Sequence, residues 1–494
     1  MSEQIGVIGA GIMGRGIAQL FAQAGFAVML FDAQGGVATK ARASILDILD
    51  REVQKGKMSA GDRDTVADRL GISEAIEGLA TAGLVVEAIL EDLSAKQSIF
   101  KQLESIVADT AILVSNTSSL TVSAIAAACD KPERVAGLHF FNPVPLMKIV
   151  EIIPGLRTDP AITDRLRELV ARTGHRSVVA ADQPGFLINH AGRALYTEGL
   201  RIVEETVTDY ATLDLVMRES CGFRMGPFEL LDLTGIDVSG KVMQSIFDQF
   251  QQDPRYRPSS LVPPRIAAGL YGRKAGRGFY EYGENPRAAP LALPVPATGP
   301  GKIWIEACDT GGHIAEMLVR GGAEQVDTPD AADIQIVLPL GEDATAAAVR
   351  LGLDPARVVA LDMVIAPDRR QVLMTPPGSG TAAAAHVAGW IAATGLPVSV
   401  IADSSGFIAQ RILAMIVNTG CEIAQRAIAS PADIDTAVTF GLGYPKGPLA
   451  LGDAIGPARI LEILETMQRL SGDPRYRPSP WLRRRAALGR SLTN

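Results

Sequence analysis

One histidine and one glutamate stand where they could act together as an acid–base pair. His139 lies near the end of an apolar run, 135–140, that is typical of a buried β-strand, and Glu151 lies in the next such run, 149–153. A histidine at this place can remove the proton of a hydroxyl group while a hydride leaves the same carbon atom. A carboxylate on its other ring nitrogen would fix the tautomer and stabilise the imidazolium. The pair therefore predicts oxidation of an alcohol, and a hydrogen-bonded structural histidine is the alternative interpretation.

Polar residues also follow the ends of two neighbouring predicted strands. The stretch 115–120 has the sequence SNTSSL and contains Ser118, and the stretch 137–143 has the sequence GLHFFNP and contains Asn142. In an open α/β sheet, the residues just past the carboxyl ends of the strands line the binding crevice. We therefore expect both stretches to border one site.

A glycine-rich turn near the N-terminus has the spacing of a dinucleotide-binding fingerprint. GAGIMG, with Gly9, Gly11 and Gly14, follows a short apolar run and opens a helical pattern. The first glycine permits the tight turn, the second lets a pyrophosphate approach the backbone, and the third lets helix and strand pack closely. The pyrophosphate would then lie on the helix N-terminus. Asp32 ends the second predicted strand, close to the spacing of about 20 residues at which a carboxylate can bind the ribose hydroxyls.

Asp32 also predicts which nucleotide binds. A carboxylate repels a 2′-phosphate, and the following residues, 33–36 (AQGG), supply no arginine to bind one. The sequence therefore favours NAD over NADP.

Residues 1–182 alternate between strand-like and helix-like segments, which predicts a doubly wound α/β sheet of the Rossmann type. From Pro184 the apolar residues recur at helical spacing, which predicts an all-α domain over 183–284. The segment 285–301 (NPRAAPLALPVPATGPG) is rich in proline, alanine and glycine, and we interpret it as a linker.

The part of the chain after this segment repeats the part before it. GFLINHAGRAL from Gly185 matches GFIAQRILAMI from Gly406, and DPRYRPS occurs at both Asp253 and Asp473. The two pairs are shifted by the same distance along the chain to within one position, which indicates an internal duplication. The predicted segments are a Rossmann domain (1–182), a helical domain (183–284), the linker (285–301), a degenerate Rossmann-like domain (302–402) and a second helical domain (403–494).

Composition and charge argue against several classes of protein. The chain has 494 residues and a net charge of −8, which argues against a nucleic-acid partner. It contains no run of 18 uncharged apolar residues, so we expect no membrane span. The four cysteines lie far apart without a CxxC pair, which argues against a disulfide framework or a zinc site and fits the cytoplasm. No bound metal is expected.

Six longer stretches over about residues 4–282 form an ordered set: GAGIMGRGIAQ, VVEAILEDLSAKQSIF, SNTSSL, ERVAGLHFFNPVPLMKIVEII, QPGFLINH and MGPFELLDLTG. This set resembles the NAD-dependent 3-hydroxyacyl-CoA dehydrogenases. The resemblance implies that His139 is the catalytic base, that Glu151 is its carboxylate partner, and that Ser118 and Asn189 contact the reacting oxygen of the substrate. It further implies that four residues contact the cofactor, namely Glu91, Lys96, Ser118 and Asn142. It also implies that Lys55 and Lys57, in a basic segment, contact the CoA nucleotide.

The resemblance implies that the protein is an enzyme that uses NAD to interconvert an (S)-3-hydroxyacyl-CoA and a 3-oxoacyl-CoA. The layout, a normal copy followed by a degraded one, resembles bacterial enzymes of phenylacetate catabolism, which act on 3-hydroxyadipyl-CoA, and of fatty acid metabolism, which act on 3-hydroxybutyryl-CoA. Two alternatives stay open: a dehydrogenase of a small free hydroxy acid, and a non-catalytic binding protein on this fold. The SNTSS, HFFNP and PGFLIN stretches argue against the first alternative, and the intact pair of His139 and Glu151 argues against the second.

The second copy has lost the residues that would do this chemistry. Alignment of the two halves gives five replacements, namely Glu306 for Gly9, Cys308 for Gly11, Asp362 for His139, Met374 for Glu151 and Gln410 for Asn189. We therefore expect one catalytic copy and one structural copy. Because the helical domain of the family buries an apolar face against a second copy, the resemblance implies that the two helical domains pack as an intrachain pseudo-dimer, and the full chain could assemble further into a homo-oligomer.

Overall fold

The computed structural model describes residues 4–283, 298–308, 311–378 and 381–494. Most of the predicted linker, 285–301, lies outside the described residues. The chain forms two compact units, one of Met1–His190 with Arg426–Leu442 and one of Ala191–Gln425 with Gly443–Asn494. The predicted boundaries cut these units more finely and stay a prediction.

A mostly parallel sheet forms the first unit, and its strand order within the described residues is β3-β2-β1-β4-β5-β6-β7-β8. Among these neighbours, β6 and β7 form the antiparallel pair. The strand order reverses at β1, which pairs with both β2 and β4, and a doubly wound sheet opens its binding crevice at such a point. The strands are β1 (Ile5–Ile8), β2 (Val28–Phe31), β3 (Leu70–Ser73), β4 (Leu84–Glu87), β5 (Ile112–Ser115), β6 (Val135–Phe140), β7 (Ile149–Pro154) and β8 (Arg176–Val179).

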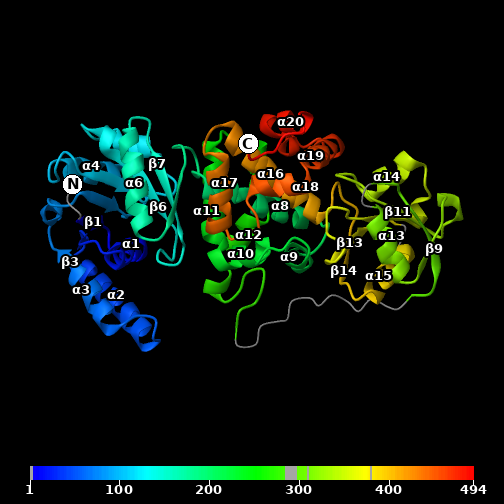
Figure 1. Ribbon diagram of the computed structural model, residues 1–494, viewed down its shortest axis with the longest axis horizontal. Helices are drawn as coiled ribbons and strands as arrows, with labels where there is room; N and C mark the ends of the chain where they lie inside the picture. Colours follow the sequence, from blue (N-terminus) through cyan, green and yellow to red (C-terminus); the bar gives the residue numbers. More distant parts are fainter. Residues whose placement is uncertain (1–3, 284–297, 309–310, 379–380) are drawn as a thin grey trace. The chain divides into compact units, whose positions relative to one another are not determined.

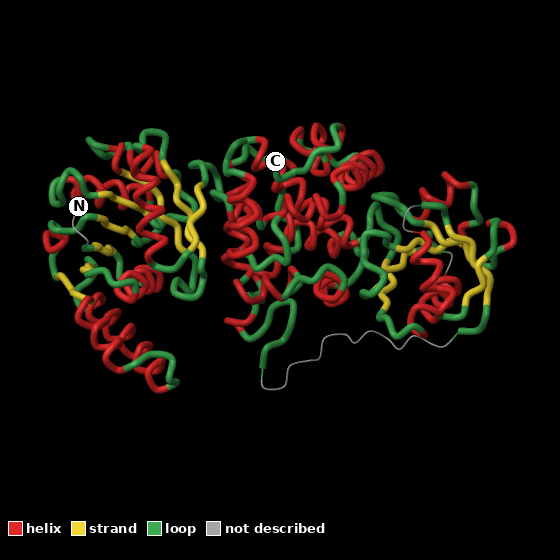
Figure 2. Tube along the Cα trace, viewed as in Figure 1, coloured by secondary structure: helices red, strands yellow, loops and turns green. Residues whose placement is uncertain are grey.

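Helices that present apolar stripes pack against this sheet. Helix α1, for example, buries Ile17, Leu20 and Phe21, at the helical spacing seen in the sequence. The long pair α2 and α3 projects from the sheet, as Figures 1 and 2 show. The helices of this unit are α1 (Ile12–Gln23), α2 (Val37–Gln54), α3 (Ala60–Arg69), η1 (Ile76–Leu79), α4 (Leu93–Glu104), α5 (Val122–Ala126), η2 (Pro132–Arg134), α6 (Pro160–Arg172), α7 (Ile188–Ala191) and α17 (Pro431–Gly441).

The second unit contains a smaller sheet, whose order in the described residues is β10-β9-β11-β12-β13-β14. It repeats the plan of the first sheet, since one antiparallel pair, β12 and β13, interrupts parallel neighbours. The predicted fold class, a Rossmann-type sheet and helical domain followed by a degenerate copy of both, is confirmed. The strands are β9 (Gly301–Ile305), β10 (Ala323–Gln325), β11 (Ile334–Val337), β12 (Val358–Leu361), β13 (Gln371–Met374) and β14 (Val398–Ile401).

The rest of the second unit is helical, and α16 lies at its centre. Every residue of α16 from Ile408 to Ala424 is buried, so this helix contacts protein on all sides. It packs against α8, which lies in the first helical segment (183–284), and against α18, α19 and α20, which lie with α16 in the second helical segment (403–494). The helices are α8 (Arg193–Glu204), α9 (Tyr210–Glu219), α10 (Pro227–Thr234), α11 (Ile236–Gln249), η3 (Pro254–Tyr256), α12 (Val262–Ala267), η4 (Arg273–Ala275), α13 (Gly311–Arg320), η5 (Pro329–Ala331), α14 (Ala344–Leu351), η6 (Pro355–Arg357), α15 (Thr381–Ala393), α16 (Ile408–Gln425), α18 (Pro448–Ile455), α19 (Pro457–Ser471), η7 (Pro474–Tyr476) and α20 (Pro480–Ala487).

A buried ionic network joins the two helical segments. The Arg411 guanidinium on α16 lies 2.7 Å from Glu198 and 2.7 Å from Glu205, and it donates to the Tyr476 hydroxyl at 3.0 Å. Arg411 and Glu198 are almost fully buried. Burial alone would raise the pKa of Glu198, but Arg411 and Arg475 outweigh burial and lower it, so the carboxylate stays ionised.

None of the described helices combines the length and the apolar character needed to cross a membrane.

Candidate active site

The glycine turn between β1 and α1 has the shape that a pyrophosphate requires. Gly9 has φ of +90°, and a Cβ there would lie 2.5 Å from the Ala88 carbonyl oxygen. A Cβ on Gly14 would lie 1.7 Å from the Gly9 carbonyl oxygen, so only glycine lets the helix approach the strand. A Cβ on Gly11 would meet nothing within 4 Å, which leaves open space beside the start of α1. These three positions fit the phosphates of a dinucleotide.

Asp32 follows β2 and braces this turn. Its Oδ2 accepts a hydrogen bond from the backbone N–H of Ala10 at 2.7 Å, and its Oδ1 accepts one from Gln34 N–H at 2.9 Å. The carboxylate therefore stands beside the glycine turn, where its remaining lone pairs could accept hydrogen bonds from ribose hydroxyls.

His139 and Glu151 face each other across the antiparallel pair β6 and β7. The ladder pairs the two residues directly, and His139 Nδ1 lies 2.6 Å from Glu151 Oε2. Both side chains are almost fully buried, and the rings of Phe141 and Phe186 lie 4.4 and 5.8 Å from the His139 ring. A carboxylate on Nδ1 keeps a proton there and leaves Nε2 as the nitrogen that can exchange a proton.

The second oxygen of Glu151 holds the chain that carries Asn189. Glu151 Oε1 accepts hydrogen bonds from the backbone N–H groups of Leu187 at 3.0 Å and Ile188 at 2.7 Å. One carboxylate thus fixes both the imidazole and the start of α7, which contains Asn189. This second contact was not predicted from the sequence.

Glu91 organises the loop that contains Ser118. Its Oε1 accepts hydrogen bonds from the Thr117 hydroxyl at 2.6 Å and from the backbone N–H groups of Ser118 and Ser119, both at 3.0 Å. Burial raises the pKa of Glu91, but the bond from Thr117 and the charge of Lys96 outweigh it and lower the pKa. Glu91 therefore stays ionised, and its cofactor contact remains a prediction.

Lys96 is buried between two carboxylates. Its Nζ lies 2.7 Å from Glu87 Oε1 and 3.3 Å from Glu91 Oε2, and Glu87 Oε2 also accepts a hydrogen bond from the Ser115 hydroxyl. Lys96 thus supports the loop after β5 from inside the protein. Its contact to the cofactor stays a prediction. Glu87 was missed by the sequence reasoning, although a glutamate inside the apolar strand LVVE is a visible signal.

Three further predicted site residues are Asn142, Lys55 and Lys57. Asn142 follows β6 and is exposed. Lys55 and Lys57 lie in the turn between α2 and α3, mostly exposed, with Glu52 at 3.9 and 3.8 Å. Asn116 was missed: its Oδ1 accepts a hydrogen bond from Phe140 N–H at 2.8 Å and so holds the end of β6 beside His139.

Comparison with known proteins shows which protein family has this arrangement. Residues 4–183 match the NAD-binding domain of 3-hydroxyacyl-CoA dehydrogenases, and residues 185–282 and 406–493 match the C-terminal domain of the same family. The chain belongs to the 3-hydroxyacyl-CoA dehydrogenase family. Its first sheet is therefore the NAD-binding domain, and its C-terminal domain occurs twice.

Relatives of this dehydrogenase differ in length. A protein of Escherichia coli K12 named 3-hydroxyadipyl-CoA dehydrogenase is 37% identical over 490 residues, which cover 98% of each chain. The crystal structure of 3-hydroxybutyryl-CoA dehydrogenase from Escherichia coli K12 superposes with a TM-score of 0.90, at 36% identity and 99% coverage of each chain. A probable 3-hydroxybutyryl-CoA dehydrogenase of Bacillus subtilis is 39% identical over 283 residues, which are 57% of this chain and 98% of that protein. The last relative matches the length of the first copy alone.

The second copy of this dehydrogenase replaces the catalytic pair by an internal hydrogen-bond network. Gln410 Nε2 donates to Asp362 Oδ1 at 3.0 Å, and Gln410 Oε1 accepts from Gly341 N–H at 2.8 Å. The strand register places Val372 across from Asp362, whereas the sequence alignment placed Met374 at the position of Glu151, so that alignment was wrong by two positions. Because either residue is apolar, the second copy has no carboxylate to pair with Asp362 across this described ladder.

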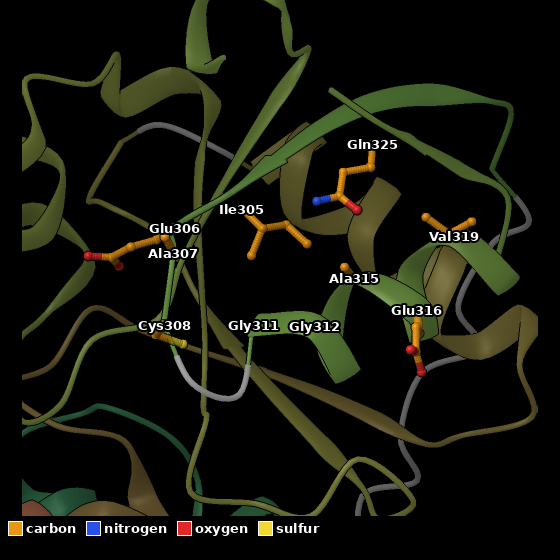
Figure 3. A pocket seen from close by; sticks show the side chains of 10 residues that line it. All are labelled: Ile305, Glu306, Ala307, Cys308, Gly311, Gly312, Ala315, Glu316, Val319 and Gln325. Atoms are coloured by element: carbon orange, nitrogen blue, oxygen red, sulfur yellow. The ribbon is translucent and has the colours of Figure 1, made fainter. Parts of the chain in front are cut away.

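A pocket remains at the start of α13, where the second copy has its counterpart of the glycine turn (Figure 3). Glu306 occupies the position of Gly9, and Figure 3 shows its carboxylate directed away from Gly311 and Gly312. That carboxylate accepts hydrogen bonds from Leu338 N–H at 2.9 Å and from Arg350 at 3.0 Å. The residues lining the pocket are Ile305, Glu306, Ala307, Cys308, Gly311, Gly312, Ala315, Glu316, Val319 and Gln325.

Replacing Asp362 by asparagine is expected to stabilise the protein at neutral pH and to leave catalysis unchanged. Burial raises the pKa of Asp362 to about 6, although Gln410 and Val364 N–H bind the charged form. Since the folded pKa lies above the unfolded value, the stability that the wild type gains from this proton is present near pH 4 and is lost as the pH rises through 6. The free energy of unfolding of Asp362→Asn should therefore exceed that of the wild type at pH 8 by about 1–3 kcal/mol and equal it near pH 4. Urea unfolding at both pH values measures this, and a difference that does not change with pH would contradict it.

Proposed function

We propose that this chain catalyses the NAD-dependent interconversion of an (S)-3-hydroxyacyl-CoA and a 3-oxoacyl-CoA, and that it does so at one site, in the first copy. The observation that carries the proposal is the buried pair of His139 and Glu151, 2.6 Å apart, on the strands that follow an NAD-binding turn. At the corresponding place in the described second copy, the Asp362 N–H donates to the Val372 carbonyl at 3.2 Å, so Asp362 lies opposite an apolar residue.

The proposed chemistry divides between the cofactor and the protein. When bound, NAD supplies the acceptor for the hydride. His139 takes the proton of the 3-hydroxyl group on Nε2 in the oxidation and returns it in the reduction. Glu151 keeps the other ring proton on Nδ1 and stabilises the imidazolium by charge. In this proposal, Ser118 and Asn189 bind the 3-oxygen, and the rings of Phe141 and Phe186 shield the imidazole from water.

The acyl group is the open part of the substrate. We propose 3-hydroxyadipyl-CoA or 3-hydroxybutyryl-CoA, in phenylacetate or fatty acid catabolism, because full-length relatives carry both names. A panel of acetoacetyl-CoA, longer 3-oxoacyl-CoAs, 3-hydroxyadipyl-CoA and free 3-hydroxybutyrate, compared by kcat/KM, tests the proposal. We expect turnover of the thioesters only. Preference for the free acid would favour the alternative dehydrogenase, and NAD binding without turnover of any compound would favour a binding protein.

We further propose that the two helical domains form an intrachain pseudo-dimer. In support, α8 packs against α16, and the two DPRYRPS segments contact each other, with Arg255 donating to the Arg477 carbonyl at 3.1 Å. Corresponding contacts also recur at the duplication offset: Ala181 N–H donates to Ile428 O, and Ala402 N–H donates to Val207 O. The molecular mass of the full chain in solution measures whether whole chains assemble further.

A chain shortened to end at Tyr282 is expected to dimerise, because it would expose the face of α8 that α16 covers. Light scattering gives its molecular mass. A stable monomer that binds no apolar dye would contradict the pseudo-dimer.

We propose that the protein is cytoplasmic, because all four cysteines, each among the described residues, are thiols rather than disulfides.

A further inference from the structure

One helix of the non-catalytic half belongs to the compact unit that contains the catalytic pair. Residues Arg426–Leu442 group with Met1–His190 rather than with the rest of the second helical segment. Within this unit, α17 packs against β7, the strand of Glu151, and against β8. Two contacts anchor the segment Arg426–Leu442: Ala181 N–H donates to the carbonyl of Ile428, just before α17, at 2.7 Å, and the Arg176 guanidinium lies 4.3 Å from the centre of the Phe440 ring on α17.

The last residue of α17, Gly441, packs tightly against Ile188. A Cβ on Gly441 would lie 2.6 Å from Cδ1 and 3.2 Å from Cγ1 of Ile188, whose side chain is buried. Gly441 does not have a positive φ, so its backbone could accept any residue. An added methyl group would therefore force the buried Ile188 side chain to shift, so glycine matters at this position for space rather than for conformation.

Ile188 in turn belongs to the active site. Its N–H donates to Glu151 Oε1 at 2.7 Å, and the next residue is Asn189. Glu151 holds the imidazole of His139 with its other oxygen. A displacement of Ile188 by α17 would thus reach the base through one intervening residue, Glu151, and the predicted substrate contact Asn189 directly.

The duplicated counterpart of this contact is built differently. Ser220, the residue that the duplication aligns with Gly441, donates its hydroxyl to the Arg370 carbonyl at 2.8 Å in the second copy. A side chain fits there and makes a hydrogen bond. On the catalytic side the same position has no side chain, which leaves room for Ile188.

We propose that Gly441 is a positioning residue for the active site, and that the non-catalytic copy thereby supplies in cis a wall that sets Ile188, Glu151 and Asn189. This inference rests on the proposed function. It gives the second copy a role in turnover besides its packing in the helical core.

The test is Gly441→Ala in the full-length chain, measured with acetoacetyl-CoA and NADH. We expect kcat to fall about tenfold or more, because small misplacements of catalytic groups are costly, and KM for NADH to stay unchanged. Ile188→Val removes the Cδ1 atom that the new methyl group meets, so the double variant should recover most of the lost kcat. Gly312→Ala, at a helical glycine where a Cβ meets nothing within 4 Å, is the matched control and should equal the wild type.

The outcomes separate this inference from the proposed function. Turnover by Gly441→Ala equal to that of the wild type would overturn the positioning role and leave the function intact. A loss of kcat that Ile188→Val does not reverse, together with an equal fall in melting temperature for single and double variants, would also overturn it. Absence of turnover in the wild type with every acyl-CoA would overturn the proposed function itself.

Discussion

Replacing His139 by alanine is expected to lower kcat by about a thousandfold, since a positioned acid–base group contributes about 10²–10⁴ to the rate. His139 Nδ1 lies 2.6 Å from Glu151 Oε2, and the imidazole stands beside the loop that contains Ser118 and beside the start of α7. The Kd for NAD should change by less than about twofold, because the glycine turn and Asp32 lie on other strands. Rates are measured by NADH absorbance and the Kd by fluorescence titration.

The matched control for His139 lies at the same position in the second copy. Asp362→Asn changes the counterpart of His139 and should retain the wild-type kcat. A His139→Ala enzyme with more than about a tenth of the wild-type rate would show that another group is the base.

Replacing Arg411 by methionine is expected to destabilise the protein by about 3–5 kcal/mol, because it leaves a buried carboxylate without its main partner. Arg411 contacts Glu198, Glu205 and Tyr476, and Glu198 would then face the more distant Arg475, at 3.8 Å, and the Tyr476 hydroxyl. The pKa of Arg411 is raised by Glu198 in spite of its burial, so the guanidinium is charged at any ordinary pH. Urea unfolding followed by circular dichroism measures the change.

A double variant separates the ion pair from the packing of the side chains. Replacing Glu198 by glutamine together with Arg411→Met removes the stranded charge, so the double variant should be more stable than Arg411→Met alone. A loss below about 1 kcal/mol for Arg411→Met, or a double variant that loses the sum of both single changes, would contradict the account.

The sequence predicts those parts of the site that lie in short, contiguous stretches at strand ends. Gly9, Gly11, Gly14 and Asp32 follow from the spacing of one βαβ unit, because such a unit forms locally. The facing of His139 and Glu151 follows from two strands that are adjacent in the chain. The duplication was also predictable, because its repeated stretches are contiguous and lie at a nearly constant distance from each other along the chain.

Contacts that depend on tertiary approach or exact register were not predictable in this way. The second oxygen of Glu151 binds backbone N–H groups 36 and 37 residues away, and nothing in their sequence marks a backbone donor. Gly441 and Ile188 are far apart in the chain, and a glycine at the end of a helix is indistinguishable from an ordinary helix end. The misplacement of Met374 arose because a shift of two positions keeps every side chain on the same face of a strand, so the apolar pattern cannot detect it.

In the proposed function, this chain oxidises a 3-hydroxyacyl thioester with NAD at the site of His139. The most direct measurement is the initial rate of NADH formation by the full-length protein with (S)-3-hydroxybutyryl-CoA, beside the same rate with free 3-hydroxybutyrate. We expect turnover of the thioester, none of the free acid, and loss of the thioester activity in His139→Ala. Equal rates with both compounds, or undiminished activity of His139→Ala, would contradict it.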